Sequence, residues 1–488
     1  MIVGTGNAAF CAALAAQQLG KEVQMIDVAP EAEFGGNSRY TAGAMRFAYE
    51  SSADLLPLLV EPDDPRIAKS DFGAYTTQQF LADLEGFNGA QPLTEQQLFL
   101  ANESLAFMQW LRQSGVQFSP IYSRQAFEKK GRFQFWGGLT LCAEGEGEGL
   151  VQRERKLFEE AGGSILYATE ARDLITEKGR VRGVNARTAN QNLRLYAKAV
   201  VLACGGFEAN PEMRSNHIGP AWQHAKVRGT RFNQGHGLTM ALQAGAALAG
   251  KFDGCHATPM DRHMPNYGNP ELSHLDRKNY RKISYPFGVM LNARGERFVD
   301  EGANFRNYTY AQYGRAILEQ PEHFAWQIFD QQVSELLYEE YKVDFASRVQ
   351  ADTLEELVTL LDGVNADVAL STLQAYNAAV TSEIEFDPTV KDGRGTRGLA
   401  LPKTNWANVL DKPPFVAYPV TCGITFSYGG LSVNTRGEVL NASEQPVPGL
   451  YACGELVGNV FFEGYPGGSG LTSGGVFGRA AGQSACGL

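Results

Sequence analysis

A short apolar strand at the start of the chain runs directly into residues whose types and spacing suit the binding of a pyrophosphate. Gly4, Gly6 and Ala9 follow the pattern Gly-x-Gly-x-x-Ala, and an alanine-rich helix comes next. The first glycine permits a tight turn, the second lets the backbone approach a phosphate, and Ala9 keeps the helix close to the strand. The free N–H groups at the start of the helix, including those of Asn7 and Ala8, would then face the anion.

An acidic residue at the end of the next expected strand supports the same chemistry. The run Glu22–Asp27 is predicted to be a short strand that ends on Asp27, where the ribose of a dinucleotide needs an acceptor for its hydroxyl. A glycine turn in an ordinary βαβ unit is the alternative explanation of Gly4 and Gly6. Because strand, helix, second strand and acid occur in this order and spacing, the sequence favours a dinucleotide site.

Size, charge and cysteine content restrict the class of protein. The 488 residues exceed one ordinary core, so two or three domains are expected. The net charge of −11 argues against a nucleic-acid partner, because a phosphate backbone requires a basic surface. The seven cysteines are scattered without metal-ligand spacing, which indicates reduced thiols in a cytoplasmic protein and no metal site. No apolar run reaches the length of a membrane span.

Several further motifs carry a resemblance to a known family. The loop Gly35–Ala44 resembles the second signature of the fumarate reductase and succinate dehydrogenase flavoproteins, in which this loop passes along the flavin. Among the members, the pattern is most similar to that of the tricarballylate dehydrogenases, on the strength of four motifs: Gly4–Ala9, Gly35–Ser38, Gly302–Tyr310 and Tyr465–Gly470. The resemblance covers nearly the whole chain and implies that the dinucleotide is FAD.

The resemblance also implies how the flavin is held. Ser38 occupies the place of the histidine that attaches the flavin in covalent members, so FAD is expected to bind noncovalently. Glu455 would reach the ribityl and pyrophosphate region, and the helix that begins at Ser469 would direct its N-terminal amides at a flavin carbonyl. Pattern and resemblance together assign the following residues to FAD: Gly4, Gly6, Asn7, Ala8, Asp27, Gly36, Asn37, Ser38, Thr41, Ala42, Gly43, Ala203, Gly205, Gly237, Gly454, Glu455, Ser469, Gly470, Leu471 and Thr472.

The expected fold is α/β, a Rossmann-like FAD-binding domain with an inserted α+β capping domain that closes over the substrate. The FAD-binding domain is expected at residues 1–250 and 423–488, and the capping domain at residues 251–422. Within the capping domain, the strands Tyr285–Leu291 and Glu296–Val299 are predicted to form a hairpin through a glycine-bearing turn.

A segment after Glu301 carries the residues expected to move a proton. Flavin dehydrogenation of a C–C bond needs such a group beside the carbon that loses the hydride. Arg306 is the predicted residue, since the arginine of the similar segment is the acid in fumarate reductases, although it stands one residue further from Glu301 here. A free guanidinium hardly loses its proton, so Tyr308 or Tyr310 is expected to act as a relay. A structural salt bridge is the alternative role of Arg306.

Two more residues are expected to contact the substrate. The resemblance places His256 where the reductases hold a substrate carboxylate. Tyr465 and the segment Thr425–Ser427 replace an arginine and a histidine of the fumarate reductases, so a C4 dicarboxylate would lose two ligands. The hydroxyl of Tyr465 suits a carboxylate oxygen or, as in ketosteroid dehydrogenases, a ring carbonyl. The arginines that could instead bind a tricarboxylate bidentately are Arg39, Arg46 and Arg281.

The combined prediction is an FAD-dependent oxidoreductase that moves a hydride between flavin N5 and a carbon next to a carboxylate or carbonyl. The expected reaction is oxidation of tricarballylate or a similar polycarboxylate to its alkene. One alternative is oxidation of a cyclic ketone to an enone, and another is a noncatalytic flavin protein that transfers electrons or senses redox state. No haem or iron-sulfur segment is recognised. A separate electron acceptor is therefore expected, either soluble or membrane-bound, and in the second case the cytoplasmic protein would associate peripherally with the membrane.

Overall fold

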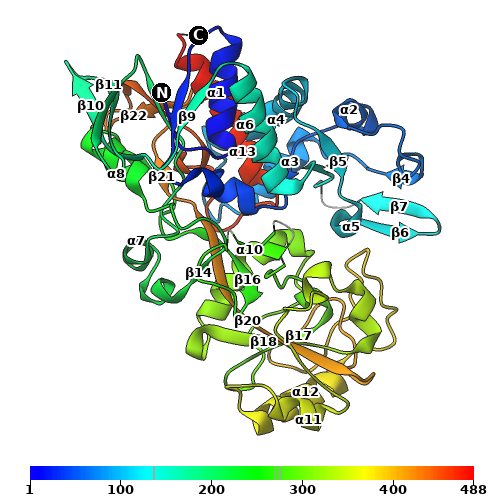
Figure 1. The fold of residues 1–488 in the computed structure, drawn as a ribbon. Coiled ribbons are helices and arrows are strands. Elements are labelled where there is room, and N and C mark those ends of the chain that lie inside the picture. Colours follow the sequence, from blue (N-terminus) through cyan, green and yellow to red (C-terminus); the bar gives the residue numbers. More distant parts are fainter. Residues whose placement is uncertain (136–137, 270, 274–275, 278, 488) are drawn as a thin grey trace. The chain divides into compact units, whose positions relative to one another are not determined.

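The computed structural model describes residues 1–135, 138–269, 271–273, 276–277 and 279–487. The chain forms two compact units, which are described separately, and Figure 1 shows the elements of each. The first unit contains Met1–Gly219, Arg228–His256 and Thr425–Leu488. The second unit contains Pro220–Val227 and Ala257–Ile424.

The first unit is built on a sheet with the strand order β22-β23-β13-β1-β2-β9, in which β1 and β13 are buried throughout. Every neighbouring pair is parallel except β22 and β23. The α/β architecture that the sequence predicts is confirmed. The strands of this sheet are β1 (Ile2–Val3), β2 (Gln24–Ile26), β9 (Ser164–Leu166), β13 (Val200–Leu202), β22 (Glu438–Leu440) and β23 (Pro446–Ala452).

Three helices of the first unit pack together: α1 (Asn7–Gln18), α6 (Glu146–Glu160) and α13 (Ser469–Ser484). Small residues allow α1 and α13 to approach closely. A Cβ added at Gly478 would lie 2.5 Å from the carbonyl oxygen of Ala8, and one added at Gly482 would lie 2.2 Å from that of Ala12. The first half of α1 therefore packs directly against the second half of α13.

The remaining elements of the first unit surround this core. Strands β10–β12 form an antiparallel sheet, and two further small sheets have the orders β3-β8-β5 and β4-β7-β6. The bounds are β3 (Ala44–Met45), α2 (Ser52–Leu55), β4 (Ser70–Asp71), α3 (Thr77–Glu85), α4 (Glu95–Gln113), β5 (Phe118–Pro120), α5 (Tyr122–Gln125), β6 (Ala126–Lys129), β7 (Arg132–Phe135), β8 (Leu141–Ala143), β10 (Glu170–Glu177), β11 (Arg180–Arg187), β12 (Asn192–Tyr196), α7 (Pro211–His217), α8 (His236–Gln243), β15 (Leu248–Ala249) and β21 (Gly430–Leu431).

The second unit is organised around the long strand β20, whose neighbours are β14, β16, β18 and β19. Its apolar core packs α11 and α12 against β17 and β18. The last residues of β20 and the first of β16 belong to the first unit. The bounds are β14 (Lys226–Val227), β16 (Cys255–Asp261), β17 (Val289–Asn292), α10 (Arg306–Leu318), β18 (Phe324–Phe329), β19 (Val349–Ala351), α11 (Leu354–Thr359), α12 (Ala366–Ala379) and β20 (Phe415–Ser427).

Two details of the second unit differ from the sequence expectation. Strand β14 belongs to it, because Lys226 and Val227 pair with β20. The predicted hairpin is wrong in its second arm: β17 pairs with β18, and the segment after the turn makes only an isolated bridge between Leu291 and Arg297. The N–H of Asn292 donates to the carbonyl oxygen of Glu296 at 3.0 Å, but that of Met290 donates to the side chain of Glu301, so the pairing extends no further.

Candidate functional site

Two glycines at the start of α1 have different surroundings. Gly4 has a φ of 114°, and a Cβ there would lie 2.3 Å from the carbonyl oxygen of Ala203, so the close approach to β13 requires glycine. Gly6 has a φ of −75°, and the nearest atom to an added Cβ is Ser38 Oγ at 3.4 Å. Protein packing alone therefore leaves space beside Gly6, directly in front of the N-terminus of α1.

The N-termini of α1 and α13 form one cradle of backbone amides. Neither helix has an acidic residue in its first turn or a side-chain cap. Asn7 Nδ2 donates to the carbonyl oxygen of Leu471 at 2.9 Å, and the backbone N–H of Asn7 donates to Ser38 Oγ at 3.1 Å. Beside Gly470, the nearest atoms to an added Cβ are ring carbons of Phe426 at 3.7 Å. Two positive helix ends with open glycines fit an anionic dinucleotide such as FAD.

Asp27 lies at the end of β2 and is linked to the second glycine loop. Its carboxylate accepts hydrogen bonds from Thr5 Oγ1 and from the backbone N–H of Ala29, the latter at 2.8 Å. Thr5 Oγ1 in turn accepts from the N–H of Gly35 at 3.0 Å. Burial raises the pKa of Asp27 despite these hydrogen bonds. The carboxylate is thus held in place where the sequence predicts a ribose acceptor.

The loop Gly36–Gly43 is fixed mainly by its own side chains. Asn37 Nδ2 donates to Glu208 Oε1 at 2.5 Å and to the carbonyl oxygen of Thr425 at 2.6 Å. Thr41 Oγ1 donates to the carbonyl oxygen of Ser38 at 2.8 Å and accepts from the N–H of Gly43 at 3.1 Å. The side chains of Asn37 and Thr41 therefore fix the conformation of the loop.

Glu455 lies in a buried carboxyl pair. Its Oε1 accepts from the backbone N–H and the hydroxyl of Ser427 at 2.7 and 2.9 Å. The side chain of Glu208 is hydrogen-bonded to it. Burial raises the pKa of both carboxyls, and in Glu208 the charge of Glu455 adds to this effect. Two carboxyls close together away from water each disfavour the other's negative charge, which adds to the effect of burial.

Three of the glycines predicted to bind FAD are packed tightly against protein atoms. An added Cβ would lie 2.3 Å from Asn233 at Gly205, 2.6 Å from Cys204 Sγ at Gly237 and 3.0 Å from the Cβ of Ala8 at Gly454. The physical reason for glycine at these positions is close packing of the loops and helices that surround the α1 and α13 termini.

His256 is fully buried within a group of aromatic rings. Its ring centroid lies 4.9 Å from that of Tyr465 and 5.4 Å from that of Phe426, which also contacts Phe461 and Tyr465. Burial, with the nearby positive charge of Arg228, lowers the pKa of His256 well below its usual value. His256 is therefore a neutral imidazole at physiological pH, beside the hydroxyl-bearing ring of Tyr465.

Arg228 was not singled out from the sequence. Its Nη1 lies 3.4 Å from Thr425 Oγ1, and its charge acts on His256. In this unit Arg228, His256 and Thr425 come from three distant segments. The pairing of β14 and β16 with β20 brings those segments side by side, and no local spacing in the sequence signals it.

In the second unit, Arg306 is the first residue of α10. Its Nε donates to the hydroxyl of Tyr338 at 2.5 Å, and the guanidinium carbon lies 4.8 Å from the ring centroid of Tyr338. Burial opposes the positive charge, but Tyr338, Tyr310 and Glu340 together raise the pKa of Arg306. Tyr338 therefore joins Tyr308 and Tyr310, which the sequence predicts, as a candidate for the relay.

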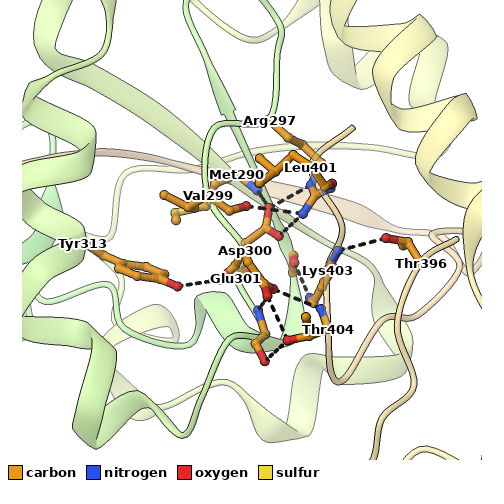
Figure 2. Close-up of polar contacts among 12 residues, drawn as sticks. Met290, Arg297, Val299, Asp300, Glu301, Tyr313, Thr396, Leu401, Lys403 and Thr404 are labelled. Atoms are coloured by element: carbon orange, nitrogen blue, oxygen red, sulfur yellow. Dashed lines mark hydrogen bonds and ion pairs between the residues drawn. The ribbon is translucent and has the colours of Figure 1, made fainter. Parts of the chain in front are cut away.

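A buried polar network fixes the segment that leads into α10 (Figure 2). Glu301 accepts from Arg297 Nη2 at 2.5 Å and from the backbone N–H of Met290 at 2.8 Å. Asp300 accepts from the hydroxyl of Thr404 at 2.8 Å and from its backbone N–H at 3.1 Å. Lys403 is fully buried, and burial lowers its pKa to about 8. This network holds the start of α10, and with it Arg306.

The three arginines proposed as tricarboxylate ligands each pair with an acid of their own unit. Arg39 lies 2.6 Å from Glu148, Arg46 lies 3.6 Å from Asp83, and Arg281 lies 2.8 Å from Glu340. Arg46 Nε also donates to the carbonyl oxygen of Gly467 at 2.8 Å, just before α13. These contacts give all three a structural role.

Within the described ranges, no His, Cys, Asp or Glu side chains form a group of three or more that could hold a metal ion. None of the helices described is long and apolar enough to cross a membrane.

Comparison with known proteins gives consistent matches. The family described as "FAD binding domain" matches residues 1–471. The fumarate reductase (cytochrome) of Shewanella frigidimarina is 26% identical over 99% of this chain and 76% of its own length. The 3-oxosteroid 1-dehydrogenase of Mycobacterium tuberculosis is 28% identical over 68% of this chain and 62% of its own length. The open conformation of a flavocytochrome c3 fumarate reductase superposes with a TM-score of 0.72 at 26% identity, covering 99% of this chain and 77% of that one.

Proposed function

The chain belongs to the FAD-binding domain family and is an FAD-dependent oxidoreductase acting on CH–CH bonds, and on this premise we propose that it oxidises a carboxylate substrate to its alkene. The substrate class that we propose is tricarballylate or a similar polycarboxylate. One observation carries this proposal: His256 and Tyr465 pack together beside Phe426, whose ring adjoins Gly470 at the N-terminus of α13. Two neutral hydrogen-bonding groups are thereby available next to the proposed flavin site.

In this proposal, FAD binds noncovalently in the amide cradle. The N-terminus of α1 with Gly4, Gly6, Asn7 and Ala8 binds the pyrophosphate, and Asp27 accepts from a ribose hydroxyl. The amides of α13 stabilise negative charge on the reduced ring. When bound, FAD accepts the hydride from substrate or returns it. The other residues proposed to line the cofactor are Gly36, Asn37, Ser38, Thr41, Ala42, Gly43, Ala203, Gly205, Gly237, Gly454, Glu455, Ser469, Gly470, Leu471 and Thr472.

We propose that Arg306 accepts the proton that leaves the substrate carbon. A guanidinium is a poor base, so it must pass its proton onward as it accepts one from substrate carbon. The hydroxyl oxygen of Tyr338 accepts a hydrogen bond from Arg306 Nε at 2.5 Å. A neutral tyrosine can take this proton only as it gives its own hydroxyl proton to solvent, so in this proposal Tyr338 relays the proton, and Tyr308 and Tyr310 are the alternative relays.

The variant Arg306→Lys tests this assignment. Loss of the positioned guanidinium should reduce turnover roughly 100-fold while FAD content stays unchanged. Tyr338→Phe, which leaves the guanidinium in place, should reduce turnover about tenfold. The exposed Arg294 offers a control, and Arg294→Lys should behave as wild type. Equal losses of turnover and FAD content in Arg306→Lys would show a structural role instead.

The substrate class is tested by mixing the oxidised protein with candidate substrates without oxygen. Tricarballylate should bleach the flavin absorbance, because the hydride reduces the ring. A flavin that stays yellow with tricarballylate but bleaches with a cyclic ketone would overturn the polycarboxylate proposal.

Oxidation of a cyclic ketone to an enone is the second candidate. The observation that favours it is the aromatic group around Tyr465, which includes Phe426, Phe461 and Tyr428. Flat rings suit a flat apolar substrate, and a tyrosine hydroxyl can polarise one carbonyl. The likeness to a 3-oxosteroid dehydrogenase supports the same candidate.

A noncatalytic flavin protein is the third candidate, and it predicts a yellow protein that no acid or ketone bleaches. For the catalytic candidates we propose that a separate electron acceptor reoxidises the flavin. Whether the acceptor is soluble or membrane-bound decides between a cytoplasmic protein and one attached peripherally to the membrane. Sedimentation of the protein with membranes that contain quinone, compared with quinone-free vesicles, distinguishes the two.

A further inference from the structure

We propose that the guanidinium of Arg228 binds a carboxylate of the substrate, with His256 and Tyr465 beside it as neutral hydrogen-bonding partners. This inference deepens the proposed function and rests on it. It concerns substrate recognition, since Arg228 makes and breaks no covalent bond in the reaction.

Strand pairing fixes the position of Arg228. Lys226 and Val227 of β14 pair in parallel with Gly423 and Ile424 of β20. Arg228 directly follows this pairing, and its Nη1 lies 3.4 Å from Oγ1 of Thr425. A separation of 3.4 Å is at the long end for a hydrogen bond, so Thr425 restrains the guanidinium only weakly. The side chain is half-buried at this position.

The second strand neighbour brings His256 to the same place. Strand β16 also pairs with β20, and His256 is its second residue. The charge of Arg228 reaches the imidazole and helps to keep it neutral. A cation beside a neutral donor, bordered by the rings of Phe426 and Tyr465, is a suitable site for an anion from which water is partly excluded.

Charge considerations favour a carboxylate over a carbonyl. The chain has a net charge of −11, so an anionic substrate must be held by a local cation. A carbonyl oxygen would be served by the hydroxyl of Tyr465 alone, whereas the planar guanidinium of Arg228 matches a carboxylate.

The test compares Arg228→Gln with Arg231→Gln. Arg231 is a matched control, because it lies in the same segment, its side chain is 56% exposed, and it pairs with Glu33. Each oxidised holoprotein is titrated with acrylate, fumarate, tricarballylate and 2-cyclohexen-1-one, and binding is followed by the shift in the flavin spectrum. Arg228→Gln should weaken binding of the three carboxylates roughly 10- to 100-fold and leave the neutral enone unchanged. Arg228→Lys should recover part of the affinity, and Arg231→Gln should match wild type.

The outcomes separate this inference from the proposed function. Undiminished carboxylate binding in Arg228→Gln, equal weakening of carboxylates and enone, or a wild type that binds only the enone would each overturn the role of Arg228. Carboxylates that bind in an Arg228-dependent way but never bleach the flavin would support the recognition role and overturn the proposed oxidation.

A second readout reports on the position of Arg228 without turnover. Removal of its charge removes one of the two causes that lower the pKa of His256. Carbon-13 NMR of labelled histidine should therefore show a higher pKa for His256 in Arg228→Gln than in wild type. An unchanged histidine titration would place the guanidinium too far from the imidazole for the shared site.

Discussion

A buried carboxyl in the first unit should make the stability of the protein depend on pH. Glu154 on α6 is fully buried, with its Oε1 3.7 Å from Cys11 Sγ. Its Oε2 has no hydrogen-bond partner among the described residues. Burial raises the pKa of Glu154 well above its usual value, so the carboxyl stays protonated in the folded protein near neutral pH.

This residue gives a stability prediction with a defined sign. Because the folded state binds the Glu154 proton more tightly than the unfolded state, its contribution to the free energy of unfolding is largest below the unfolded pKa and falls as pH rises. Glu154→Gln mimics the protonated form and should raise Tm relative to wild type by ~2 °C or more at pH 8, with a smaller difference at pH 5. Differential scanning calorimetry across this range measures it. Glu160→Gln, whose side chain on the same helix is 61% exposed, is the control. A pH-independent difference for Glu154→Gln would contradict the prediction.

At the scale of elements, the helix that presents Arg306 is positioned by residues outside it. Glu301 and its partner Arg297 have side chains that are 0% and 5% exposed, and Figure 2 shows both beside Asp300 and Lys403. Removing one member of such a buried pair leaves the other charged and unpaired, which costs far more than loss of a surface pair.

Glu301→Gln should therefore destabilise the protein by about 3–5 kcal/mol and reduce turnover through displacement of Arg306. Urea unfolding measures the first effect, and kcat with FAD content measures the second. The exposed pair Arg397–Glu383 supplies a control, and Glu383→Gln should cost less than about 1 kcal/mol. A free energy of unfolding equal to wild type in Glu301→Gln would show that this network does not stabilise the second unit.

At the scale of the whole molecule, the two units contain different parts of the proposed chemistry. The cradle for FAD, His256 and Tyr465 belong to the first unit, and Arg306 with Tyr338 belongs to the second. Ligand binding to a folded unit stabilises it by mass action. The stability of the molecule should therefore depend on whether FAD is bound.

FAD added to the apoprotein at about 100 times its Kd should stabilise the wild type by about 2.7 kcal/mol. Gly6→Val should fold, since φ at this position is −75° and the nearest atom to a Cβ is 3.4 Å away, but its side chain would fill the space for the pyrophosphate. It should show no thermal shift with FAD. Gly86→Ala, at a helix end, should respond as wild type does. A thermal shift with FAD equal to that of wild type in Gly6→Val would show that the pyrophosphate does not bind at the N-terminus of α1.

The sequence by itself determined the class of fold and the cofactor. Gly4, Gly6 and Asp27 lie in one strand-helix-strand unit, where short-range spacing specifies backbone turns and helix ends, and such patterns are readable along the chain. The resemblance to the flavoprotein family was recognisable in the sequence for the same reason.

Only the tertiary structure decided which side chains meet. The Arg228 guanidinium meets Thr425 across 197 residues of sequence, and the amide of Asn37 meets Glu208 across 171. The predicted hairpin after Asn292 makes only one isolated bridge, because the side chain of Glu301 accepts the N–H of Met290. Such partners depend on pairing between distant strands and on burial of each charge beside another, and neither is encoded in the spacing of residues along a single segment.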